Sequence, residues 1–219
     1  MSAPGGVLLL HGHGRFGASM VVLAKAARRE GYATLSPAYL YRRSLGEIVE
    51  WLAPRVAAFE QEFAGPMHIL THSLGGLVAR AFLTARRPKR LGRVVMLAPP
   101  NAGSELADLL VRLRLARLVL GAAGAHLGTI RTASDEGALG AVNYPLGIIA
   151  GGKALLPLSL GLLPRPHDGK VSVAATHVVG LTDHLTLPVT HTLMVYDRRV
   201  IAAALGFLRD GCFDRPPAE

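Results

Sequence analysis

The 219-residue chain is half hydrophobic with a mean hydropathy of +0.34, which excludes a disordered protein and suits one compact domain with a substantial core. Its net charge of +9 raises the question of nucleic-acid binding. The arginines are scattered, however, and aromatic residues are only 5% of the chain, so we expect no nucleic-acid partner. The charge is compatible with peripheral contact with an anionic membrane surface, and the oligomeric state is left open.

The N-terminal residues have neither the basic region nor the long apolar run of a signal peptide. The apolar run at 7–10 is too short to span a membrane. The single cysteine, Cys212, cannot form an internal disulfide. We therefore expect a cytoplasmic protein.

Apolar runs typical of buried strands alternate with helical patterns through the first half of the chain. Ser44 and Glu47 form the capping-box pattern at the start of one helix, and Pro54 is expected to kink it. The alternation indicates parallel βαβ units, and so an α/β protein with a mostly parallel central sheet and helices on both faces. The expected strands are 7–10, 32–36, 67–71 and 93–97, and the expected helices are 18–30, 44–63 and 75–87.

The residues after position 100 are less regular. A helix is expected at 104–120, with leucines on more than one face, so it needs apolar surroundings on two sides. Then follow an expected strand at 147–151, a leucine- and proline-rich loop at 155–164, a strand at 173–181 and a last amphipathic helix at 197–209. The chain 1–219 is interpreted as a single domain, in which 101–166 forms a small lid or lines a pocket.

The sharpest motif is Thr71-His72-Ser73-Leu74-Gly75, which lies where a strand meets a helix. A tight turn there forces the serine into strained backbone geometry and presents its hydroxyl at the carboxyl end of the sheet. Thr71 stands where glycine is usual. The alternative is that Ser73 only caps the following helix, but the strand–turn–helix context favours a nucleophile.

A glycine-rich loop, His11-Gly12-His13-Gly14, follows the first strand. Such a loop lends a backbone N–H to an oxyanion hole, and we expect the donors to be the N–H groups of His13 and Leu74. The alternatives are a plain glycine turn, or a metal site at His11 and His13. No cysteine or carboxylate cluster lies nearby in the sequence, so no metal is expected.

A serine nucleophile needs a base and a carboxylate that orients the base. In a fold of this kind the chain order is serine, then the acidic residue, then histidine. His191 lies between the last expected strand and the last helix, where a loop base belongs; His184 is the competitor. Asp168 lies in an Asp-Gly turn that can hold a carboxylate at a loop tip. Asp183 is the alternative acid, interpreted as a turn residue that closes the strand at 173–181.

These motifs together resemble the small lipase and esterase branch of the α/β-hydrolase superfamily. The resemblance rests on HGHG, THSLGG, LAPPNAGSELAD, HDGKVSV and LPVTH, which run from residue 7 to about residue 191. It implies Ser73 as nucleophile, Asp168 as acid and His191 as base, with no cofactor. Two features depart from it: the segment before Asp168 is longer than a minimal loop, and no large cap domain is present.

The expected activity is hydrolysis of carboxylic esters through an acyl-enzyme intermediate. Apolar stretches at 106–120 and 155–163 suggest a pocket for a medium or long acyl chain, although ordinary core packing explains them equally well. The alternatives are an acyltransferase, thioesterase or amidase on the same three residues, or a non-catalytic binding protein that retains the fold.

Overall fold

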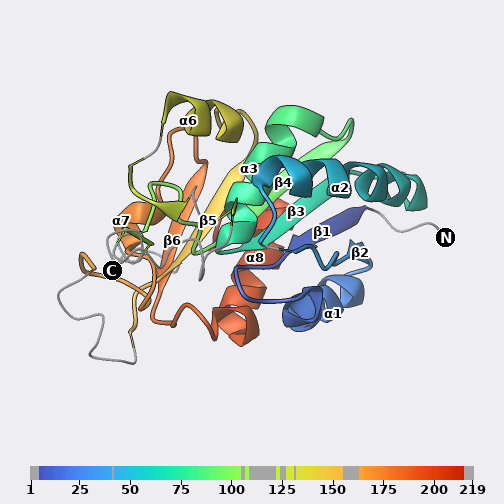
Figure 1. The fold of residues 1–219 in the computed structure, drawn as a ribbon. Coiled ribbons are helices and arrows are strands. Elements are labelled where there is room, and N and C mark those ends of the chain that lie inside the picture. Colours follow the sequence, from blue (N-terminus) through green and yellow to red (C-terminus); the bar gives the residue numbers. More distant parts are fainter. Residues whose placement is uncertain are drawn as a thin grey trace.

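The computed structural model describes residues 5–40, 42–104, 107–108, 122–123, 127–130, 132–154 and 163–214. They form one six-stranded sheet in the order β2-β1-β3-β4-β5-β6, in which every pair of neighbours is parallel. Figure 1 shows the sheet running through the molecule, with helices on both of its faces. The strands are β1 (Gly6–Leu10), β2 (Ala33–Leu35), β3 (Met67–His72), β4 (Leu91–Leu97), β5 (Leu146–Gly151) and β6 (Asp183–Leu187).

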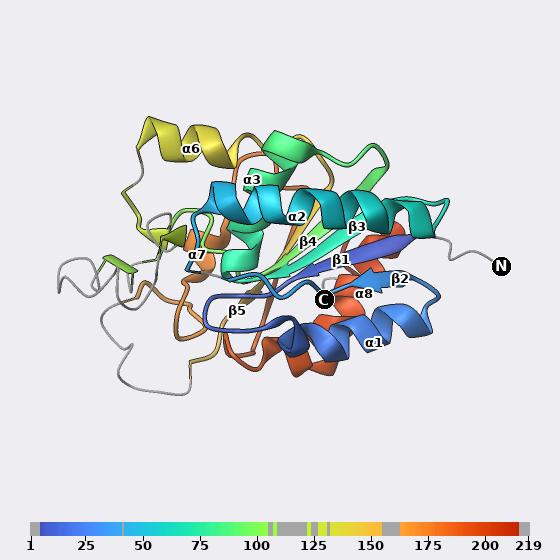
Figure 2. The ribbon, with the colours of Figure 1, turned by 45° about the vertical axis from the view of Figure 1, so that its right-hand side comes forward.

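The helices divide between the two faces, as Figure 2 shows, with α1 and α8 on one side and α2, α3 and α6 on the other. Strand β1 illustrates why: Leu8 and Leu10 belong to the core under α2 and α3, and Val7 and Leu9 to the core under α1 and α8. A strand buried on both faces must be apolar at every position, which explains the continuous run. The helices are α1 (Val21–Arg29), α2 (Leu45–Phe59), α3 (Leu74–Arg86), α6 (Ala133–Leu139), α7 (Val173–Thr176) and α8 (Arg198–Asp210), with 3₁₀ turns η1 (Gly17–Met20), η2 (Glu60–Glu62) and η5 (Met194–Tyr196).

The predicted α/β class and the mostly parallel sheet are confirmed. The capping box is also present, since Ser44 accepts from the Glu47 N–H and the Glu47 carboxylate accepts from the Ser44 N–H. Helix α2 is continuous through Pro54. Of the helix predicted at 104–120, residue 104 is not helical, residues 107–108 are helical, and the rest lies outside the described residues, as does most of the loop at 155–164. In the part of the chain that is described, no helix has both the length and the apolar character needed to cross a membrane.

The strand predicted at 173–181 is wrong. Ser172 accepts a hydrogen bond from the Ala175 N–H and so begins the short helix α7, and Gly180 then takes a φ of 91° in the turn before β6. The apolar residues at 173–181 resemble a buried strand in composition, but it is β6, at Asp183–Leu187, that pairs with β5. Asp183 is therefore the first residue of an edge strand and does not close one.

Candidate active site

Ser73 stands between β3 and α3 in a backbone conformation that is rare for a residue with a side chain. Its φ is 54° and its ψ is −124°, and its hydroxyl makes no capping bond to the helix. The capping interpretation of Ser73 therefore finds no support in the geometry. A Cβ added to Gly75 would lie 2.3 Å from the Leu10 carbonyl oxygen, so only glycine lets α3 approach β1 this closely.

The structure brings Ser73, His191 and Asp168 into one hydrogen-bonded relay. The Ser73 Oγ lies 2.9 Å from His191 Nε2, and His191 Nδ1 lies 2.7 Å from Asp168 Oδ2. His191 and Asp168 are buried, whereas Ser73 is partly exposed. The arrangement joins a hydroxyl that a ligand can reach to a base with a buried carboxylate behind it, which is the geometry that activates a serine.

Asp168 is held by its own turn. Its Oδ1 accepts from the N–H groups of Lys170, at 2.9 Å, and Val171, at 2.8 Å, while Gly169 takes a φ of 99°. Both lone-pair directions of Oδ1 are thus used by the backbone, and Oδ2 is left to face His191. A Cβ added to Gly151, the last residue of β5, would lie 2.7 Å from the Asp168 Cβ, so a glycine there makes room for the Asp168 side chain.

Asp183 and His184 are not brought to this relay. Both lie at the amino end of β6, whereas Ser73 stands at the carboxyl end of β3 in the same parallel sheet. The Asp183 carboxylate accepts from the N–H groups of His184 and Phe213, and His184 Nε2 lies 2.9 Å from the Thr176 hydroxyl. Both side chains therefore have structural partners at the opposite edge.

The loop after β1 lies against Ser73. A Cβ added to Gly12 would lie 3.1 Å from the Ser73 Cβ, and His13 occupies the turn that follows. The His11 carbonyl accepts from the Tyr39 hydroxyl, and the two rings stack with centroids 4.1 Å apart. Leu74 is the first residue of α3, so its N–H has no acceptor within the helix. The loop after β1 and the first turn of α3 thus both lie beside Ser73.

Solved structures of known proteins superpose on most of the chain. The mature form of the Bacillus licheniformis lipase BlEst2 gives a TM-score of 0.77 at 18% identity, covering 94% of this chain and 92% of that one. A structure described with the metagenome-derived lipolytic enzymes LipS and LipT gives 0.65 at 16% identity, covering 95% of each chain. The pyrethroid hydrolase PytH with BIF gives 0.61 at 16% identity, covering 94% and 98%.

The chain has the α/β-hydrolase fold. This likeness is one of structure, since no protein-family model and no curated protein matches the sequence. In an α/β-hydrolase fold, sites form outside the carboxyl ends of the strands, where the loops after β1, β3, β5 and β6 meet. The relay lies at this edge.

Two residues that the sequence interpretation missed also belong to this edge of the α/β-hydrolase sheet. His72 is buried beside Ser73, and its Nε2 lies 2.9 Å from the main-chain oxygen of His191. The Arg15 guanidinium donates to the main-chain carbonyl oxygen of Thr192 at 2.8 Å. This bond ties the loop after β1 to the loop that carries His191. Only the position of His72 next to the serine could have drawn attention to it, because its partner is 119 residues away.

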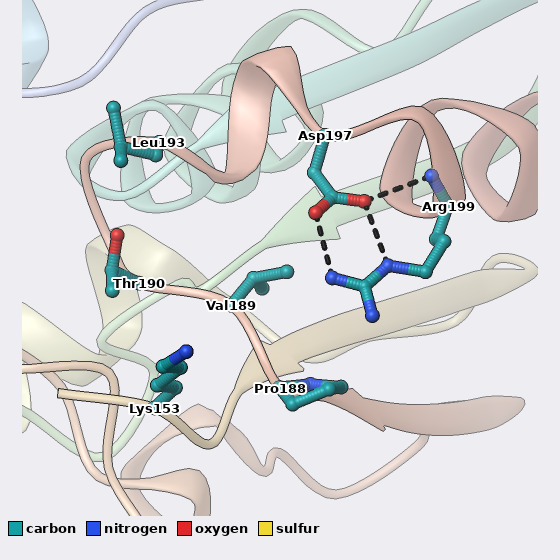
Figure 3. A pocket seen from close by; sticks show the side chains of 7 residues that line it. All are labelled: Lys153, Pro188, Val189, Thr190, Leu193, Asp197 and Arg199. Carbon is teal, nitrogen blue, oxygen red and sulfur yellow. Dashed lines mark hydrogen bonds and ion pairs between the residues drawn. The ribbon is translucent and has the colours of Figure 1, made fainter.

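A pocket of about 240 Å³ adjoins the segment that carries His191, and Figure 3 shows the side chains that line it. Thr190 and Leu193 face it on one side, and the Asp197–Arg199 ion pair, at 2.8 Å, on the other. The Arg199 guanidinium lowers the pKa of Asp197 to about 2 by hydrogen bonding to its carboxylate. None of the three relay residues lines this pocket, so it is separate from the Ser73 hydroxyl.

Proposed function

We propose that this protein is a serine hydrolase that cleaves carboxylic esters, with Ser73 as nucleophile, His191 as general base and Asp168 as the carboxylate that orients the base. The observation that carries the proposal is the unbroken relay of 2.9 Å and 2.7 Å that ends on a partly exposed serine. The strained backbone at Ser73 supports it, because such strain persists where the surrounding structure holds a residue for function.

In the proposed reaction His191 Nε2 takes the Ser73 proton while Oγ attacks the ester carbonyl carbon. The C–O bond of the ester then breaks, and the alcohol leaves with the proton from His191. Water, deprotonated by the same histidine, attacks the acyl carbon; the bond to Ser73 Oγ then breaks, His191 returns the proton to Oγ, and the carboxylic acid product leaves. Asp168 stabilises the imidazolium that forms in each step and keeps the Nδ1 proton in place.

The negative charge on the tetrahedral intermediate needs donors that are already in position. We assign this role to the main-chain N–H groups of Leu74 and His13. Leu74 begins α3, where free N–H groups and the helix dipole favour an anion. The packing of Gly12 against Ser73 supports the assignment of His13, the next residue. Each such donor typically stabilises the transition state by about 3 kcal/mol.

The proposed substrate is an ester with an apolar acyl group. Phe16 and Leu193 are exposed, and the Arg15–Thr192 hydrogen bond joins the two segments that carry them, next to the relay. The similar structures are named as a lipase, as lipolytic enzymes and as a pyrethroid hydrolase, which also favours apolar esters. Most of the apolar stretches at 106–120 and 155–163 lies outside the described residues, so their role as an acyl pocket stays a prediction.

The test is the variant Ser73→Ala. We expect it to lose hydrolysis of p-nitrophenyl esters and labelling by a fluorophosphonate probe while keeping the unfolding midpoint of the wild type. Turnover retained by this variant would overturn the proposal. A series of matched ester, thioester and amide substrates, with alcohols added as competing acceptors, separates an esterase from a thioesterase, an amidase or an acyltransferase. A wild-type protein that the probe does not label would favour the non-catalytic alternative.

A further inference from the structure

His72 is a polar side chain that lies against both loops of the site, at the end of the strand that leads to Ser73. It is the last residue of β3 and is 1% exposed. Its Nε2 lies 2.9 Å from the His191 carbonyl oxygen, and a Cβ added to Gly12 would lie 3.0 Å from its Nδ1. The ring therefore fills the space between the loop after β1 and the loop that carries the base.

The partners fix the chemical form of this ring. A carbonyl oxygen only accepts, so the proton must be on Nε2 of His72. Its Nδ1 is buried without a hydrogen-bond partner, and the ring of His191 lies 4.8 Å away, centroid to centroid. Burial, reinforced by the proximity of His191, lowers the pKa of His72 well below its usual value. His72 is thus a neutral donor that does not repel the imidazolium formed at His191.

The bond from His72 completes a clamp on the main chain of the base. The His191 N–H donates to the Asp168 carbonyl oxygen at 3.0 Å, and the His191 carbonyl accepts from His72. The first bond ties the base to its acid, and the second ties it to the residue next to the nucleophile. Without the second bond, the main chain of His191 keeps its tie to Asp168 but loses its direct tie to β3, on which the 2.9 Å separation of Ser73 Oγ and His191 Nε2 depends.

We propose that His72 is a positioning residue, whose Nε2–H bond to the His191 carbonyl holds the loop that carries the base in register with β3, the strand that leads to Ser73. This inference rests on the proposed function for its kinetic consequence, but not for the geometry. Displacement of a reacting group by about 1 Å can lower a rate on the order of 100-fold, so a loosened loop affects kcat without a comparable change in KM.

The experiment compares His72→Gln with His72→Asn and His72→Leu. Glutamine carries an amide N–H near the place of Nε2, whereas asparagine carries the same amide on a shorter chain, and leucine has no donor. We expect kcat to fall about 10-fold to 100-fold in His72→Asn and His72→Leu, and His72→Gln to restore most of it. Because glutamine and asparagine bury the same amide group, a difference in kcat between the two variants reflects the length of the side chain and not its polarity.

His68→Gln is the matched control. His68 is buried on the same face of β3, four residues earlier, and its Nδ1 accepts from the Arg93 N–H at 3.0 Å, far from the relay along the strand. We expect this variant to lose stability while kcat stays at the wild-type value. An equal loss of kcat in His68→Gln and His72→Asn would show that the loss comes from reduced stability and not from a displaced base, and would overturn the inference.

A second readout does not depend on turnover. The proton between His191 Nδ1 and Asp168 gives a downfield ¹H resonance when the pair is held in place, and we expect it in the wild type and in His72→Gln. It should broaden or disappear in His72→Asn and His72→Leu, or in whichever of them folds. An unchanged resonance in all variants overturns the positioning role. A sharp resonance in a wild-type protein without esterase activity rejects the proposed function, while the comparison of variants still decides the role of His72.

Discussion

At the scale of single residues, the geometry of the site depends on which hydrogen bonds each polar group already makes with its neighbours. The Oδ1 atom of Asp168 accepts from two backbone N–H groups, so the carboxylate cannot rotate without losing both. Oδ2 must then face His191 Nδ1. Because Oδ2 accepts, Nδ1 carries a proton and donates it to this bond. The lone pair of His191 Nε2 is left for the Ser73 hydroxyl, and the tautomer follows from the turn that holds Asp168.

Asp168→Asn tests this reasoning. The side-chain oxygen of the new amide is expected to keep the two backbone donors, which turns the NH₂ group toward His191 Nδ1 and forces the ring proton to Nε2. His191 then cannot take the Ser73 proton, and we expect kcat on a p-nitrophenyl ester to fall by about 10³- to 10⁴-fold. Asp183→Asn, at the opposite edge of the sheet, is the control and should keep full activity. A loss of less than tenfold in Asp168→Asn would contradict the proposed relay.

At the scale of elements, the close approach of α3 to β1 decides where Ser73 stands. Gly75 faces the carbonyl oxygens of Leu10 and His11, at 2.3 Å and 2.9 Å from the place of an added Cβ. These are backbone atoms that cannot swing aside, so any side chain must push the helix away from the strand. Among the described residues, a Cβ added to Gly206, inside α8, would meet only the Arg209 guanidinium, at 3.9 Å.

The two glycines therefore predict opposite effects for one substitution. Gly75→Ala is expected to lower the free energy of unfolding by about 3 kcal/mol, since overpacking forces backbone shifts. Gly206→Ala is expected to raise it by about 0.5–1 kcal/mol, because alanine loses less backbone entropy than glycine on entering a helix. Urea unfolding followed by circular dichroism measures both changes. Equal effects in the two variants would contradict the packing argument.

At the scale of the whole molecule, covering both faces of one parallel sheet buries several histidines in neutral form. Burial lowers the pKa values of His11 and His72, and it lowers that of His68 to about 4 with a contribution from Arg93. In the unfolded chain these groups titrate near 6.5. Between pH 4 and 6.5 the unfolded state therefore binds more protons than the native state, and stability must rise with pH across this window.

We expect the free energy of unfolding to be nearly constant above pH 6.5 and to fall as the pH is lowered toward 4. The His68 shift contributes up to about 3 kcal/mol of this loss. Chemical denaturation at a series of pH values measures the slope, and His68→Gln should show a shallower one. The same slope in the variant and the wild type would mean that His68 is not the neutral buried group described here.

Much of the fold followed from local patterns. The apolar runs at 7–10 and 67–71 were confirmed as β1 and β3, and the capping box at Ser44 does begin a helix. The error at 173–181 arose because a short apolar stretch has the same composition whether it forms a capped helical turn or a strand. Only pairing with β5 distinguishes the two, and that pairing begins at Asp183.

The sequence by itself determined the class of fold and the residue types of the site, because strand and helix periodicity and the turn around Ser73 are local properties of the chain. The tertiary structure decided which histidine faces that serine and which carboxylate faces the histidine. It assembled Ser73 and His191 across 118 positions, left Asp183 and His184 at the other edge, and added the bond from His72. The reason is physical: contacts between distant segments depend on how loops converge at one edge of the sheet, and no local pattern encodes that convergence.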